Sequence, residues 1–148
     1  MLAELEMISD AQTCSAAIFI RDGAILLGLR NYIRHDEWKT VPLWTTPGGR
    51  CNIGESVGNG LLREIHEETG MKDIEIHSYI GNYPGAKAGD IVHVFVCESP
   101  NEPALMEPDK FSEWQWHPIS DLPVNVISPH LPLILERTIA ALERKYEI

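Results

Sequence analysis

The spacing of apolar and polar residues predicts two strands at the start of the chain. Residues 14–20 and 24–30 are rich in aliphatic and β-branched residues, and they flank the dipeptide Asp22-Gly23. Asp-Gly tolerates the positive φ angles of a tight turn, so the two runs predict a β-hairpin. The stretch from residue 31 to 42 is polar and aromatic without a clear period. It predicts a loop.

The clearest helix of the chain is predicted at residues 56–69. Ser56 can cap its first turn, and Gly70 stands where a glycine commonly ends a helix. Gly58 and Gly60 are poor helix formers, so we expect an irregular first turn. The apolar residues recur every four positions and would form one stripe: Val57, Leu61 and Ile65.

The rest of the pattern predicts more strands and one further helix. Residues 74–83, 91–97 and 113–118 read as strands, residues 43–46 as a short extended piece before the turn Pro47-Gly48-Gly49, and residues 129–146 as the last helix. The order of hairpin, helix, strands and helix favours an α+β fold, in which a mixed sheet is sandwiched between helices. No linker divides the sequence, so we predict a single domain over residues 1–148.

The charge of the chain is strongly acidic. The formal net charge is −10 over 148 residues, and no basic stripe is visible. Nucleic-acid binders usually carry such a stripe, so we expect no stable nucleic-acid binding. An acid excess also repels small phosphate compounds. A site that uses phosphate would therefore need local cations or a metal ion.

The cysteines and the first residues bear on the location of the protein. Cys14, Cys51 and Cys97 are odd in number, widely spaced and without a C-x-x-C pair, which argues against a disulfide framework and for a reducing compartment. Residues 1–12 lack the basic start and apolar run of a signal peptide. No apolar stretch approaches the roughly 18 to 20 residues that cross a membrane. We expect a cytoplasmic protein.

Three acids of the predicted helix carry the candidate chemistry. Glu64, Glu67 and Glu68 stand at positions i, i+3 and i+4, which are neighbours on one helix face and repel one another. Arg63 can offset only one of them. Ligand sets of oxygen alone select hard cations such as Mg²⁺, Mn²⁺ or Ca²⁺, and Mg²⁺ lets substrate phosphates complete its shell. The cluster predicts a magnesium site, although a solvated acidic helix face would give the same short pattern.

Residues 49–71 resemble a known sequence pattern, and this resemblance favours the metal site over a solvated acidic face. The segment GRCNIGESVGNGLLREIHEETGM fills every fixed position of G-x5-E-x7-R-E-U-x-E-E-x-G-U, where U is a bulky aliphatic residue. This pattern is the Nudix box, and the chain resembles the Nudix (MutT-like) hydrolases. A weaker likeness extends over about residues 16–123. The first acid of the box is Glu55.

The resemblance implies a reaction and a set of residues. Nudix hydrolases cut a phosphoanhydride bond in nucleoside diphosphate derivatives with Mg²⁺, or Mn²⁺, as cofactor. By matching position, Glu67 and Glu68 are implied as metal ligands, and Glu64 as a third ligand or the base that activates water. The Gly48 carbonyl is implied as a backbone ligand. Arg63 is implied to orient the glutamates.

The resemblance also implies residues outside the box. Glu107 matches a loop acid that relatives often use as general base, although an ordinary loop acid is an equal alternative. Arg30 matches an arginine that relatives often use against substrate phosphate. Trp114 and Trp116, two apart on a predicted strand, are assigned to the core. The aromatic residues that could stack on a base are Tyr32, Trp38 and Trp44.

The substrate stays open at this level. The first hypothesis is a nucleoside triphosphate pyrophosphohydrolase that releases pyrophosphate and a monophosphate. The second keeps the enzyme and changes the substrate to ADP-ribose, a nucleotide sugar or a dinucleoside polyphosphate. The third is a catalytically silent Nudix fold, which the complete set of box acids disfavours. The expected partner is a small nucleotide, and because family members are often dimers, a homodimer is the preferred assembly.

Overall fold

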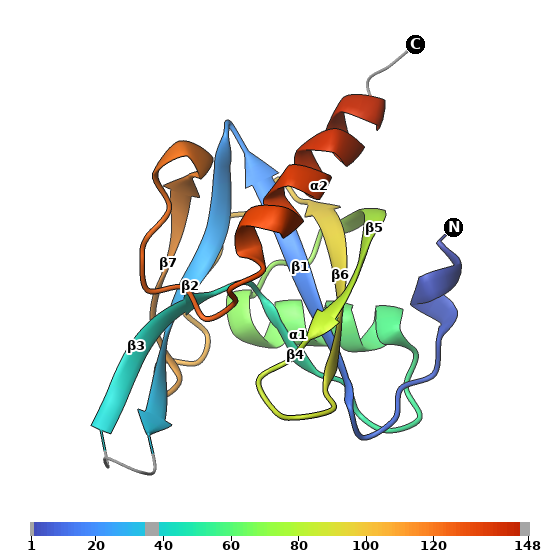
Figure 1. Cartoon of the computed structure of the whole chain (residues 1–148), viewed down its shortest axis with the longest axis horizontal. Coiled ribbons are helices and arrows are strands. Elements are labelled where there is room, and N and C mark those ends of the chain that lie inside the picture. The colour runs from blue at the N-terminus through green and yellow to red at the C-terminus, as the bar shows by residue number, and fades with distance from the viewer. Residues whose placement is uncertain (1, 35–38, 146–148) are drawn as a thin grey trace.

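A computed structural model describes residues 2–34 and 39–145. Its strands form one seven-stranded sheet with the order β3-β2-β1-β6-β5, in which β4 pairs with β1 and β7 with β2 (Figure 1). The strands are β1 (Thr13–Arg21), β2 (Ala24–Arg34), β3 (Lys39–Thr45), β4 (Gly48–Arg50), β5 (Glu75–Pro84), β6 (Ile91–Glu98) and β7 (Phe111–Pro118). The helices are α1 (Val57–Thr69), α2 (Leu131–Lys145) and the short 3₁₀ helices η1 (Ala3–Glu6) and η2 (Ile119–Asp121).

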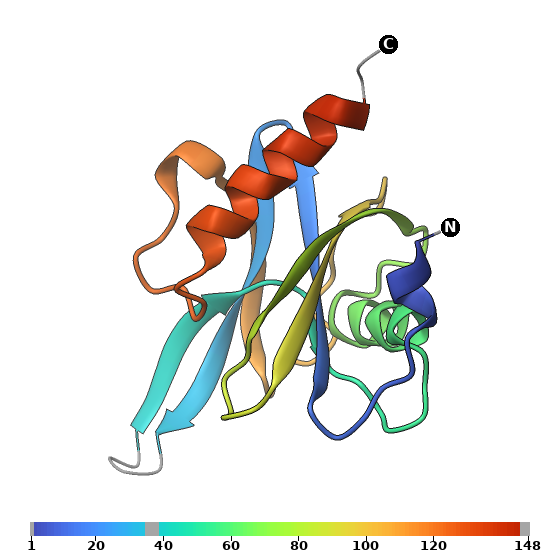
Figure 2. The same cartoon turned by 45° about the vertical axis from the view of Figure 1, so that its right-hand side comes forward.

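The two long helices cover opposite faces of the sheet, as the pattern predicts. Successive side chains of β1 alternate between two cores: Ala17 and Phe19 pack with residues of α1, whereas Ile18 packs with residues of α2. Figure 2 shows α1 and α2 well apart, with the strands between them. The predicted α/β/α sandwich is confirmed. Trp114 and Trp116 pack against the α1-side core, as predicted.

The predicted hairpin is much shorter than its strands. β1 and β2 pair only next to their turn, at Ile20 with Ile25 and Arg21 with Ala24. Beyond that point β1 pairs in parallel with β6, and β2 pairs with β3 and β7. β6 therefore lies inside the sheet between β1 and β5, in agreement with its β-branched and aromatic composition.

Two segments without a strand-like pattern are strands. The predicted loop at residues 31–42 is wrong at both ends. β2 continues to Arg34 and pairs with β3, so that Asn31 lies opposite Pro42 and Arg34 lies opposite Lys39. The predicted turn at Pro47-Gly48-Gly49 is confirmed only at Pro47, where the chain bends, because Gly48 and Gly49 belong to β4, which runs along β1. In both cases a partner strand satisfies the backbone hydrogen bonds, so the side-chain pattern decides little.

Helix α1 has the predicted caps and a regular first turn. The Ser56 side chain accepts a hydrogen bond from the Asn59 backbone at 3.2 Å, and Gly70 adopts the left-handed conformation with φ 72°. The expected irregularity is absent, since the α-helix begins at Val57 and includes both early glycines. At Gly60 a Cβ atom would lie 2.7 Å from the Cys51 sulfur, so this glycine permits close packing.

Candidate active site

The acidic face of α1 meets strand β4 at Glu68. Only 3% of Glu68 is exposed, and its Oε1 atom accepts a hydrogen bond of 2.8 Å from the Gly48 backbone N–H. Glu68 and Gly48, which the resemblance implies as metal ligands, are thus in direct contact. Helix and strand converge at one point of the Nudix box.

Glycine is required at Gly48 and gives close contact at Gly49, the two positions of β4 that face this point. Gly48 has φ 138°, and a Cβ atom there would lie 2.2 Å from the Ser15 carbonyl oxygen. At Gly49 a Cβ atom would lie 2.9 Å from a carboxylate oxygen of Glu64. A larger residue at Gly48 would push β4 away from β1, and one at Gly49 would displace the Glu64 carboxylate.

Arg63 ties the acids of the box together. Its guanidinium lies 2.8 Å from a carboxylate oxygen of Glu55, 3.2 Å from Glu64 and 3.3 Å from Glu67. Glu55 also accepts a hydrogen bond of 2.6 Å from the Asn52 backbone in the box loop. One arginine therefore links the loop to two acids of the helix, in line with the orienting role that the resemblance implies.

The electrostatics of the site disfavour an unpaired negative charge. Burial raises the pKa of Glu68 to about 8, and the nearby carboxylates of Glu64 and Glu107 add to the rise. The Gly48 N–H and the positive charge of Arg30 oppose it. Burial is also the main cause of the raised pKa of Glu64. A bound cation would relieve the cost of ionising these groups.

The donor chemistry of this face fits a hard divalent cation, because every candidate ligand is an oxygen atom. In residues 2–34 and 39–145, however, no three His, Cys, Asp or Glu side chains are already arranged to hold a metal. The side chains of Glu64 and Glu67 instead contact Arg63, and Glu68 contacts Gly48. The oxygen ligands that such a cation needs are present, but in the described residues their side chains do not yet converge on one point.

Arg30 and Glu107 lie close enough to the acidic face to act on it. The charge of Glu107 raises the pKa of both Glu64 and Glu68, and the charge of Arg30 lowers that of Glu68. Glu107 pairs with Lys110 at 3.3 Å in the connection between β6 and β7. The structure therefore brings together two residues that lie far from the box in sequence.

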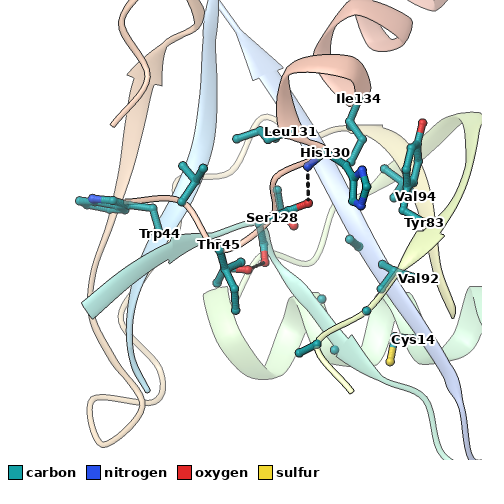
Figure 3. A pocket seen from close by; sticks show the side chains of 18 of the residues that line it. Cys14, Trp44, Thr45, Tyr83, Val92, Val94, Ser128, His130, Leu131 and Ile134 are labelled. Atoms are coloured by element: carbon teal, nitrogen blue, oxygen red, sulfur yellow. Dashed lines mark hydrogen bonds between the residues drawn. The ribbon is translucent and has the colours of Figure 1, made fainter. Parts of the chain in front are cut away.

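A cavity of about 450 Å³ opens beside the box on the α2 side of the sheet. Gly48, Gly49 and Arg30 belong to its wall, so the cavity adjoins the acidic face. Its volume is within the usual range for a small-molecule site. Aliphatic and aromatic side chains make up much of the remaining wall: Ile18, Leu27, Tyr32, Trp44, Tyr83, Val92, Val94, Leu131 and Ile134 (Figure 3).

Trp44 contributes to this wall from within the α2-side core. Only 8% of the residue is exposed, and its ring meets the His117 ring at a centroid distance of 4.3 Å with an interplanar angle of 73°. Its backbone is fixed by hydrogen bonds with Asn125 and Ile127. Trp44 is thus one of the residues that line the cavity, while its ring packs against His117. Trp38, the other tryptophan considered for stacking, lies outside the described residues.

Sequence reasoning missed one end of the cavity. Tyr83, Ser128 and His130 line it, and Figure 3 shows the His130 ring between the other two side chains. The His130 backbone donates to the Ser128 hydroxyl at 3.2 Å, and the His130 and Tyr83 rings are 5.8 Å apart. The only local signal is that Ser128 and Pro129 resemble a helix start. That signal does not indicate what the first turn of α2 faces.

The described helices include none that is long and apolar enough to span a membrane.

Comparison with known proteins agrees with the geometry. A protein of Bacillus subtilis (strain 168), provisionally named an 8-oxo-dGTP diphosphatase, is 34% identical over 89 residues, which span 60% of this chain and 59% of that protein. The RNA pyrophosphohydrolase of Brucella ovis is 29% identical over 142 residues, covering 80% of this chain and 79% of the relative. The crystal structure of a MutT NUDIX hydrolase from Burkholderia pseudomallei superposes with a TM-score of 0.63 at 27% identity, covering 87% and 98% of the two chains.

The family model of the NUDIX domain matches residues 12–136. This range contains the whole box, the sheet and the residues that border the cavity up to Ile134. The chain belongs to the Nudix family and is a hydrolase that acts on phosphoanhydride bonds.

Proposed function

We propose that this protein is a Mg²⁺-dependent nucleoside triphosphate pyrophosphohydrolase, which converts a nucleoside triphosphate and water into the monophosphate and pyrophosphate. The observation that carries the proposal is the junction at Gly48 and Gly49. On one side stands the acidic face of α1, and on the other a largely apolar cavity of about 450 Å³. A triphosphate can place its phosphates at the acidic face and its nucleoside in the cavity.

The acids and the Gly48 carbonyl would hold the metal ion. Glu67 and Glu68 are the proposed side-chain ligands, with Glu64 as a third ligand or as a base. When bound, Mg²⁺ neutralises phosphate charge and acidifies a coordinated water molecule. Arg63 holds the carboxylates of both Glu64 and Glu67 close to its guanidinium through ion pairs.

Two residues outside the helix complete the proposed site. Glu107 accepts a proton from the attacking water, because it lies by the acidic face without belonging to the proposed metal ligands. Arg30 binds a phosphate oxygen of the substrate, for which the planar guanidinium is well suited. Its guanidinium lies over the rings of Tyr32 and Phe111, at 5.1 Å and 5.6 Å from their centroids, which restricts its position.

The wall of the cavity supports a nucleobase over a second sugar. Apolar and aromatic surfaces such as those of Tyr32, Tyr83 and Leu131 suit the flat faces of a base. The hydroxyl groups of a hexose would lose hydrogen bonds to water there without regaining them. Nucleotide sugars are therefore the weaker alternative to triphosphates.

A second candidate substrate is the 5′-triphosphate end of an RNA. It is favoured by the RNA pyrophosphohydrolase of Brucella ovis, which aligns with 80% of this chain. The same phosphoanhydride chemistry would serve both substrates. The formal net charge of −10 disfavours a long RNA, because the protein would repel its backbone.

A hydrolysis screen tests the proposal. The panel contains unmodified and oxidised nucleoside triphosphates, a short 5′-triphosphorylated RNA, ADP-ribose, nucleotide sugars and dinucleoside polyphosphates, each with Mg²⁺ and with EDTA. Products are identified by chromatography. Mg²⁺-dependent release of pyrophosphate from free triphosphates is the expected result. Cleavage confined to another class would replace the substrate assignment, and no metal-dependent cleavage of any compound would overturn the catalytic proposal.

The location and assembly belong to the same proposal. We place the protein in the cytoplasm because its three cysteines are free, and two of them are buried. A homodimer is proposed as its assembly. Light scattering coupled to size-exclusion chromatography distinguishes a dimer from the 16.6 kDa monomer.

A further inference from the structure

Arg21 holds the chain segment that leads to Glu107. It is the last residue of β1, and its guanidinium donates hydrogen bonds to the carbonyls of Ser99 at 2.5 Å and Asn101 at 2.9 Å. It also pairs with the Glu102 carboxylate and lies over the Trp116 ring at 4.4 Å from the centroid. Arg21 thus contacts three residues of the connection between β6 and β7, and one residue of β7.

Asn101 fastens the same connection to the segment that follows α1. Its Oδ1 atom accepts hydrogen bonds of 3.0 Å from the backbones of both Lys72 and Asp73, and its Nδ2 atom donates to the Asp73 carboxylate at 3.1 Å. Three residues on, the Ala104 N–H donates to the carbonyl of Thr69, the last residue of α1, at 2.8 Å. These hydrogen bonds therefore hold the connection against the C-terminal end of α1, the helix that carries the acids.

These tethers limit where Glu107 can lie. Glu107 is three residues beyond Ala104, and three residues reach at most about 10 Å. On its other side, the Lys110 carbonyl accepts a hydrogen bond of 3.1 Å from the Asn31 backbone in β2. The Glu107 backbone is consequently held between the end of α1 and strand β2, on which Arg30 lies.

We propose that Arg21 and Asn101 form a clamp that positions Glu107 against the acidic face of α1. The inference rests on the proposed role of Glu107 as general base. Neither clamp residue lines the cavity or belongs to the proposed metal ligands, so both are positioning residues. Their contribution is expected in kcat, because an error of about 1 Å in the position of a catalytic group can cost as much as 10²-fold in rate.

A double-mutant cycle separates positioning from folding. The variants are Arg21→Met, Glu107→Gln and the pair, with Arg144→Met as the control that removes an exposed arginine from α2. kcat and KM are measured on the panel compound that is cut fastest, and stability by urea unfolding. Arg21→Met should lower kcat about tenfold and leave KM within about twofold. In the Glu107→Gln background it should lower kcat by less than about twofold, and Arg144→Met should change neither value.

The other outcomes fall on different assignments. An equal loss of kcat from Arg21→Met in both backgrounds, or an effect on KM alone, would overturn the clamp. So would wild-type kcat in Arg21→Met when Glu107→Gln is impaired. Wild-type kcat in Glu107→Gln would overturn the general base itself, and the clamp with it. If Arg21→Met does not fold, Asn101→Ala and Arg21→Lys enter the same cycle, since lysine keeps the charge without the planar fork.

Discussion

The carboxyl group of Glu68 lies buried between the end of α1 and the Gly48 backbone, beside the charges of Glu64, Glu107 and Arg30. A polar group in such a place is costly when it ionises without a partner. The proposed metal ligand Glu68 therefore costs the metal-free fold some of its stability when it ionises. Replacing such a carboxylate by the uncharged amide should therefore change the stability of the metal-free protein measurably.

The pH dependence of stability should report Glu68. Its folded pKa of about 8 exceeds the ordinary value of 4.5, so folding takes up a proton between these values, and the metal-free protein loses stability as pH rises from about 5 to 8. Each unit of pKa difference corresponds to about 1.4 kcal/mol. In EDTA, Glu68→Gln should become more stable than the wild type by about 1–4 kcal/mol as the pH rises across this range. Urea unfolding at several pH values measures the difference, and parallel pH profiles would contradict it.

Glu67 should matter for turnover and little for folding. Its side chain is 48% exposed and pairs with Arg63 at 3.3 Å, and ion pairs this exposed contribute little to stability. Glu67→Gln should remove most activity, by about 10²-fold or more if metal binding is lost, while urea unfolding stays within about 0.5 kcal/mol of the wild type. The control Glu143→Gln changes an exposed acid of α2. Unchanged turnover in Glu67→Gln would exclude it as a ligand.

At the scale of elements, α1 is the part that local chemistry determines. Its apolar stripe, the Ser56 cap and the left-handed Gly70 are all signals within a few residues, and the structure confirms each. The antiparallel pairing of β2 with β3 could not be predicted in the same way. Asn31 to Arg34 become a strand through pairing with β3, not through their own pattern.

The end of α1 offers a test at this scale. Gly70 has φ 72°, which costs a residue with a Cβ atom about 1–2 kcal/mol. Gly70→Ala should lower the unfolding free energy by about 1 kcal/mol, and Gly70→Asn by less, because asparagine tolerates this conformation. Urea unfolding of both variants gives the ranking. Equal losses would indicate that contact with the Met106 side chain, rather than backbone strain, sets the cost.

Across the whole molecule, one sheet separates two hydrophobic cores and joins distant segments into one site. The box could be predicted because its spacing is fixed within 23 residues. The cavity could not, since Tyr83, His130 and Trp44 come from different elements and meet only when the sheet and α2 are packed. Glu107 is an intermediate case. The resemblance indicated the residue, but only the fold shows which contacts hold its chain segment beside α1.

The two cores should unfold together if residues 1–148 form the predicted single domain. Trp44 belongs to the α2-side core and Trp114 packs against the α1-side core. Trp116 packs with Trp114 against the α1-side core, so the second variant replaces both. Fluorescence of Trp44→Phe and of the double variant Trp114→Phe/Trp116→Phe should give the same urea midpoint within each variant as circular dichroism does. Two separated transitions would mean that the cores are independent units.

The parallel pairing of β1 with β6 has a consequence for biosynthesis. Thr13 pairs with Ile91 and Phe19 with Cys97, so β1 leaves the ribosome before β6 and gains its main partner only later. Contacts between such distant segments form slowly. Until then the apolar side chains of β1 for both cores stay exposed in the nascent chain. This strand is therefore where chaperone binding or aggregation during synthesis should begin.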